Sequence, residues 1–112
     1  MRLISKASAW FIRFFTKGEP PYKVVYVEEP PTELNKNYLY LIGENEHLWH
    51  IVLLCPCGCN SHIYLNLQPE NHPVWTYRIQ KQRISIKPSV WRTSGCRSHF
   101  WITSGTVKWV LL

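Results

Sequence analysis

Cysteine spacing is the feature that most constrains how this chain can fold. Three cysteines fall within five residues, Cys55-Pro-Cys57-Gly-Cys59 (the cysteine knuckle), and Cys96 lies far downstream. Cysteines this close cannot pair comfortably with one another, because a disulfide needs Cα atoms roughly 5.5–6 Å apart in a specific geometry. A zinc ion accepts four thiolate or imidazole ligands at about 2.0–2.3 Å, and a tight turn can present several at once. The spacing therefore predicts a zinc site that ties the middle of the chain to its last third.

The predicted zinc site is structural rather than catalytic. Four thiolates around one ion leave no open position for an activated water, whereas catalytic zinc sites keep such a position. His62 and His99 follow the cysteines closely in sequence, so either imidazole is an alternative ligand. Free buried thiols without a metal are one other interpretation of the cluster, and a disulfide is another.

The N-terminal segment indicates the compartment in which these thiols reside. Its apolar residues are interrupted by Arg2, Lys6, Arg13 and Lys17, which is not typical of a signal peptide. No apolar run approaches the ~20 residues that are needed to cross a bilayer. We therefore expect a cytoplasmic protein with reduced thiols, a setting in which cysteine clusters are more often metal sites than disulfides.

The spacing of apolar residues changes after residue 18. Residues 3–15 repeat apolar side chains every three or four positions, which predicts an amphipathic helix within residues 1–18. From there on, short alternating runs bounded by turn residues predict strands over 22–28, 37–42, 47–54, 62–67, 74–79, 83–86, 99–103 and 106–110. We expect a zinc-stabilised β domain over residues 22–112, built as a small antiparallel sandwich or a partly open barrel.

Two residues near the C-terminus suit nucleophilic catalysis. Ser89 lies just before an expected strand and His99 begins the last hairpin. Histidine is the usual base for a hydroxyl nucleophile, and zinc bound to Cys96 would hold His99 in place. Serines in loops and histidines at strand edges are also common without any catalytic role, so the spacing alone favours a structural interpretation.

Basic and aromatic residues alternate in the second half of the chain, which carries part of a formal net charge of +6. Aromatic rings beside cations on a small β scaffold can stack single-stranded bases. Tryptophans on strands more often fill the core of a small domain, and we favour that interpretation over nucleic-acid binding. The residues concerned are Trp75, Trp91, Trp101 and Trp109 with Arg78, Lys81, Arg83, Arg92 and Arg97.

Four segments resemble, in order and spacing, the BubE family of small bacterial domains associated with ubiquitin-like conjugation operons. The resemblance covers about residues 47–110 and does not include the N-terminal helix. The segments are the cysteine knuckle, Pro88-Ser-Val-Trp-Arg92, Gly95-Cys-Arg-Ser-His-Phe-Trp-Ile102 and Gly105-Thr-Val-Lys-Trp109.

The resemblance implies a deubiquitinase-like serine protease that processes a ubiquitin-like protein or removes it from targets. It implies Ser89 as the nucleophile and His99 as its base, with Ser98 as the competing nucleophile. Neighbouring side chains on an extended strand point to opposite faces, which argues against Ser98. Arg92 and Arg97 would contact an acidic face or the terminal carboxylate of the ubiquitin-like partner. The third member of a triad stays open, with Glu44 and Glu46 as candidates by position.

Two functions without catalysis remain open. A zinc-stabilised adaptor would use the helix and aromatic residues to hold an E1- or E2-like enzyme of the conjugation pathway. A nucleic-acid-binding module would use the basic strands, and its binding would weaken steeply with salt. Neither a nucleic acid nor a membrane is the partner that we expect.

Overall fold

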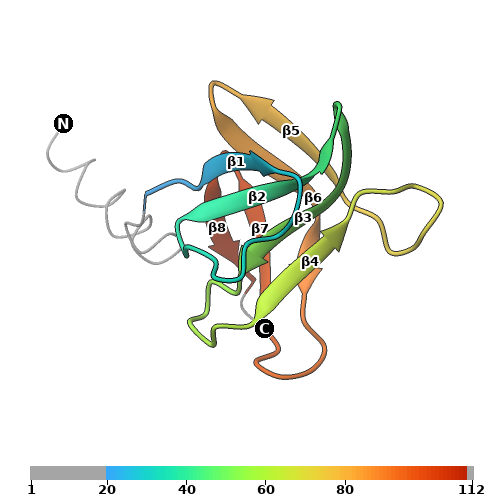
Figure 1. Ribbon diagram of the computed structural model, residues 1–112. Coiled ribbons are helices and arrows are strands. Elements are labelled where there is room, and N and C mark those ends of the chain that lie inside the picture. The colour runs from blue at the N-terminus through green and yellow to red at the C-terminus, as the bar shows by residue number, and fades with distance from the viewer. Residues whose placement is uncertain (1–19, 111–112) are drawn as a thin grey trace, which may run out of the picture.

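The computed structural model describes residues 20–110, so the helix expected within residues 1–18 lies outside the described residues. From residue 20 to residue 110 the chain is mainly β, with no helix and therefore none that could cross a membrane (Figure 1). The strands in this range are β1 (Lys23–Val27), β2 (Tyr38–Glu44), β3 (His47–Leu54), β4 (His62–Asn66), β5 (Thr76–Gln80), β6 (Arg83–Trp91), β7 (His99–Thr103) and β8 (Thr106–Trp109).

The strands form two four-stranded sheets, and the described part of the chain contains no closed barrel. The first sheet has the order β1-β2-β3-β4 and the second the order β5-β6-β7-β8. Figure 1 shows the two sheets packed across each other, with the β3–β4 turn and the β6–β7 loop at the same end. The cysteine knuckle occupies the β3–β4 turn, as the sequence predicts, because β3 and β4 are antiparallel neighbours.

The expectation of an entirely antiparallel fold is wrong at one position. β1 runs parallel to β2, with Lys23 opposite Tyr38. Pro30 and Pro31 follow β1 and supply no backbone N–H donors, which disfavours a tight antiparallel hairpin. The chain instead returns through residues 28–37 and starts β2 from the same end of the sheet. The other neighbouring strands of the two sheets are antiparallel.

Strand β6 is longer than the four residues expected at 83–86. It continues to Trp91 through Pro88, a residue that normally marks a strand edge or a bulge. The pairing with β7 shifts register between Ile86 and Val90, so this interval of β6 forms a bulge. A bulge re-aims side chains locally, and Ser89 lies within this one.

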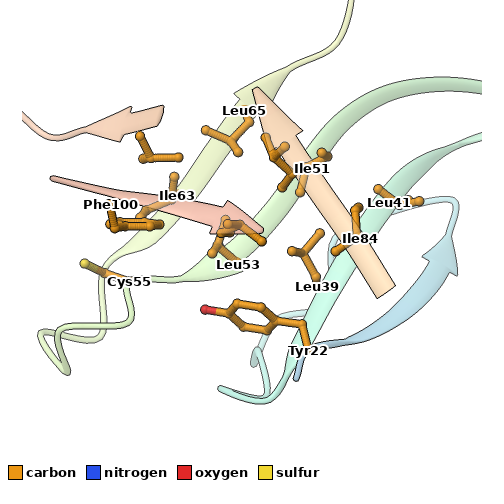
Figure 2. Packing of buried hydrophobic residues seen from close by; sticks show 13 residues of the cluster. Tyr22, Leu39, Leu41, Ile51, Leu53, Cys55, Ile63, Leu65, Ile84 and Phe100 are labelled. Atoms are coloured by element: carbon orange, nitrogen blue, oxygen red, sulfur yellow. The ribbon is translucent and has the colours of Figure 1, made fainter. Parts of the chain in front are cut away.

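The hydrophobic core lies between the two sheets. Leu39, Ile51 and Leu65 of the first sheet and Ile84 and Phe100 of the second belong to one buried cluster, which Figure 2 shows from close by. Because successive side chains of a strand alternate between faces, Tyr40, Ile42 and Val52 point to the opposite face of the first sheet, where they form a second buried cluster against which Leu34 and Trp49 pack.

The tryptophans divide between this core and the surface. Trp75 and Trp109 pack against the buried cluster, as we expected of core residues. Trp91 and Trp101 are 59% and 40% exposed, so the prediction that they fill the core is wrong. Both lie on the second sheet. The residues that precede them on their strands, Val90 and Phe100, face the core, so Trp91 and Trp101 face outward.

Candidate active site and metal centre

The four cysteines converge at the end of the molecule where the β3–β4 turn meets the β6–β7 loop. Their sulfur atoms all lie within 4.8 Å of one another, and all four thiols are free. Cys55 Sγ is 3.4 Å from Cys57 Sγ and 3.6 Å from Cys96 Sγ. Tetrahedral zinc with ligands at ~2.3 Å would place its sulfurs about 3.8 Å apart, so the observed spacing fits such an ion. The described group of four includes neither His62 nor His99.

Backbone geometry explains how the knuckle presents three sulfurs at once. The Cys55 N–H donates to the Ser61 carbonyl at 2.8 Å, and the Gly58 N–H donates to the Cys55 carbonyl at 3.2 Å. Gly58 has a φ of 97°, in the left-handed region that a side chain would strain. The sequence Cys-Pro-Cys-Gly-Cys therefore folds into a tight turn whose cysteine side chains point to a common centre.

The environments of the thiols differ in a way that suits a bound cation. Burial raises the pKa of the Cys55 thiol to about 12. Hydrogen bonds from the hydroxyl and backbone of Ser61 lower the pKa of Cys59 to about 6. The hydroxyl and backbone of Ser98 lower the pKa of Cys96 in the same way. The two thiols of lowered pKa at the rim, beside the buried Cys55, form a donor set that a soft divalent metal would suit.

Ser98 belongs to the surroundings of the cysteines. It is buried, and its Oγ lies 3.1 Å from Cys96 Sγ and 3.8 Å from Cys55 Sγ. The Arg92 Nη1 lies 3.8 Å from Cys96 Sγ and 3.9 Å from Cys59 Sγ, so this guanidinium also faces the sulfurs.

Arg97 occupies the loop beside the cysteines. It is exposed, with a φ of 56°, and its backbone N–H donates to the Ser94 carbonyl at 3.3 Å.

The structure brings Ser89 and His99 into direct contact. Ser89 Oγ lies 2.8 Å from His99 Nε2, a distance typical of a strong hydrogen bond. The bulge in β6 positions the serine, and the pairing of Trp91 with His99 aligns the histidine. Trp75 Nε1 donates to the Ser89 carbonyl at 3.3 Å and anchors the backbone of the bulge from the core side.

The other ring nitrogen of His99 has an unusual environment. Its Nδ1 is buried and has no hydrogen-bond partner among residues 20–110. The imidazole instead stacks on Trp91, with ring centroids 4.8 Å apart and planes inclined by only 7°.

Glu44 and Glu46, the candidates for a third triad member, lie elsewhere. They line an open cavity of about 530 Å³ at the β2–β3 turn, together with Tyr26 and Tyr77. The pair formed by Ser89 and His99 does not line this cavity and sits on the outer face of the second sheet.

Sequence reasoning missed two members of this site, the anchoring residue Trp75 and the stacking residue Trp91. Alternation along a strand was the available signal for Trp91, since Ser89 and Trp91 are two residues apart and share a face. The contact of Trp75 with Ser89 spans fourteen residues and two strands, so no local pattern predicts it.

A model of one protein family matches residues 26–110, a span that contains the four cysteines, Ser89 and His99. The description of that family is "Bacterial ubiquitination-like system serine protease (BubE)". No significant match was found among curated proteins or among solved structures.

Proposed function

The chain belongs to the BubE family, described as the serine protease of a bacterial ubiquitination-like system, and we propose that its Ser89 and His99 cleave the bond that follows the C-terminus of a ubiquitin-like protein. The observation that carries the proposal is the 2.8 Å contact between Ser89 Oγ and His99 Nε2. This is the distance that a nucleophile and its general base require.

In the first half of the proposed reaction, His99 Nε2 accepts the Ser89 hydroxyl proton as Oγ attacks the carbonyl carbon of the scissile bond. The proton then passes from His99 to the leaving amine or alcohol, and the bond between that group and the carbonyl carbon breaks. In the second half, His99 takes a proton from water as the water oxygen attacks the acyl-serine. Return of that proton to Ser89 Oγ releases the ubiquitin-like protein with a free carboxylate.

The choice of Ser89 over Ser98 rests on what each hydroxyl faces. Ser98 Oγ lies among the sulfurs, 3.1 Å from Cys96 Sγ, whereas Ser89 Oγ faces His99 on the outer side of the sheet. A hydroxyl engaged with a metal-ligating sulfur is poorly placed to attack a substrate carbonyl. Ser98 in this proposal supports the cysteines, and Ser89 performs the chemistry.

The four cysteines would hold a structural zinc ion that is closed to substrate. When bound, the ion supplies four strong metal–thiolate bonds and no activated water, because all its positions are filled by sulfur. Cys96 is three residues from His99 on the chain, so a fixed Cys96 restrains the start of β7. We propose zinc as a cofactor of the fold of residues 22–112 rather than of the reaction.

The proposed partner is a ubiquitin-like protein, which the exposed Arg97 at the edge of the site would contact through a carboxylate. Arg92 faces the sulfurs and would contribute mainly to the charge of this edge. E1- or E2-like enzymes of the same pathway would be further partners. If the protein bound these enzymes but cleaved nothing, it would be an adaptor.

The experiment is cleavage of a bacterial ubiquitin-like protein that carries a reporter domain fused to its C-terminus. Wild-type protein should release the reporter, and Ser89→Ala and His99→Ala should each reduce release to background while zinc content and melting temperature stay unchanged. Ser98→Ala is the matched serine control and should still cleave.

Loss of activity in Ser98→Ala together with an active Ser89→Ala variant would transfer the nucleophile to Ser98. A wild-type protein that cleaves no such fusion, but binds an E1- or E2-like enzyme, would replace the protease with the adaptor.

A further inference from the structure

We propose that Trp91 is the positioning residue of His99 and takes over two tasks that a carboxylate has in a Ser-His-Asp triad, orienting the imidazole and stabilising the imidazolium. This inference rests on the proposed protease function. The imidazole of His99 lies flat against the indole of Trp91, with centroids 4.8 Å apart and planes within 7°. Such a face-to-face contact fixes the plane of the ring, and orienting the ring is one of the tasks of the triad carboxylate.

The stack and the catalytic hydrogen bond use different parts of the imidazole, so both can exist at once. His99 Nε2 meets Ser89 Oγ at the ring edge, while Trp91 covers a ring face. The remaining nitrogen, Nδ1, has no acceptor among residues 20–110. Since this nitrogen is buried within the described part of the chain, a substrate on the outer face of the sheet does not reach it.

Another task of the triad carboxylate is to stabilise the imidazolium ion that forms when the base accepts a proton. The face of an indole carries negative potential and attracts a cation held against it. His99 is neutral before the serine attacks and cationic in the transition state, so this attraction strengthens during the reaction. The stack should therefore raise kcat, with little effect on the binding of substrate.

The fold explains why Trp91 is available for this role. Trp91 and His99 are register partners on β6 and β7, and Ser89 lies two residues before Trp91 on the same face of β6. One strand therefore carries both the nucleophile and the residue that orients its base. Trp91 is 59% exposed, so its contact with the histidine, rather than burial in the core, accounts for its position.

The test compares Trp91→Leu and Trp91→Phe with the wild-type protein and with Trp101→Leu, which removes another exposed tryptophan of the same sheet. Two rates are measured: cleavage of the ubiquitin-like fusion, resolved into kcat and KM, and covalent labelling of the serine by a fluorophosphonate probe.

We expect Trp91→Leu to lower kcat and the labelling rate by about 5- to 30-fold, with KM changed less than about 2-fold. Phenylalanine retains a π face and should restore most of the lost rate. Trp101→Leu should label at the wild-type rate.

A second set of variants covers the case in which leucine disturbs the fold. Site-specific replacement of Trp91 by fluorinated tryptophans withdraws negative potential from the ring face while the shape of the ring is nearly kept. The inference predicts that kcat falls stepwise with the number of fluorine atoms, at constant zinc content and melting temperature.

Four outcomes would overturn the inference. Constant kcat across the fluorinated series would remove the electrostatic role. A Trp91→Leu variant that changes KM alone would make Trp91 a substrate contact. A wild-type protein that neither cleaves the fusion nor reacts with the probe would refute the proposed function itself. An active wild-type protein with an equally active Trp91→Leu variant would refute only the role of Trp91.

Discussion

Replacing Cys96 with serine tests how the cysteine cluster stabilises the fold. Cys96 is the one cysteine of the described cluster that lies in the β6–β7 loop of the second sheet, and it is 41 residues from Cys55 along the chain. In the Cys96→Ser variant, the proposed zinc could stay on the cysteine knuckle, but the proposed link between the sheets would be lost. A cross-link that closes a loop of this length lowers the conformational entropy of the unfolded chain and so stabilises the fold by about 4 kcal/mol.

This loss is a large part of the total stability of a small domain, which is typically about 5–15 kcal/mol. At about 4–8 °C per kcal/mol for a domain of this size, the melting temperature should fall by about 15–30 °C. The measurement is a thermal melt with zinc analysis of the same sample, with and without a strong chelator.

Ser94→Ala is the matched control for Cys96→Ser. Ser94 lies in the same loop and contributes its backbone carbonyl, which alanine keeps. The control should melt at the wild-type temperature. A Cys96→Ser protein that also melts there would refute the cross-link, and a folded wild-type protein without metal, indifferent to the chelator, would refute the zinc site.

Ser98→Ala removes the hydroxyl beside Cys96 Sγ, so the free energy of unfolding should fall by about 1–3 kcal/mol. Zinc retention should weaken, which chelator competition would measure, and a cleavage assay should show that activity is preserved. Trp75→Phe keeps the ring but loses the donor to the Ser89 carbonyl, so denaturant unfolding should show a loss of about 0.5–1.5 kcal/mol. If Trp75 orients Ser89 through this hydrogen bond, kcat should also fall in Trp75→Phe, and by more than in the Trp109→Phe control. Deletion of residues 1–18 should leave zinc content and turnover unchanged and alter partner binding, which a pull-down with the conjugation enzymes would detect.

Local patterns in the sequence were sufficient for the features that depend on local chemistry. The spacing of Cys55, Cys57 and Cys59, with Pro56 and Gly58 between them, predicted a tight turn, because three cysteines at alternate positions can direct their sulfurs to one centre only if the chain turns. The dipeptide Ser104-Gly105 predicted the last hairpin, and both residues adopt the positive φ that such a turn requires, 49° and 81°.

The features that the sequence did not predict depend on pairing between distant segments. Strand β1 is parallel to β2 because of the path that the chain takes after Pro30 and Pro31. The alternation of side chains along a strand does not indicate whether its neighbour runs parallel or antiparallel to it. The exposure of Trp91 depends on the register of β6 against β7 beyond the bulge. Contact between Ser89 and His99 was expected from the family resemblance, whereas the burial of His99 Nδ1 without a partner needed the packed structure.

The bulge in β6 has a consequence for insertions and deletions in this segment. Between the pairs Ile86–Ile102 and Val90–Phe100, three residues of β6 occupy the interval that Trp101 alone spans on β7. Because side chains alternate along a strand, shortening this interval by two residues would keep Ile86 and Val90 facing the core. Shortening it by one would leave two residues of β6 opposite Trp101, as in a one-residue bulge, and would move Ser89 relative to His99. The fold should therefore tolerate a change of length in this segment more readily than the contact between Ser89 and His99 does.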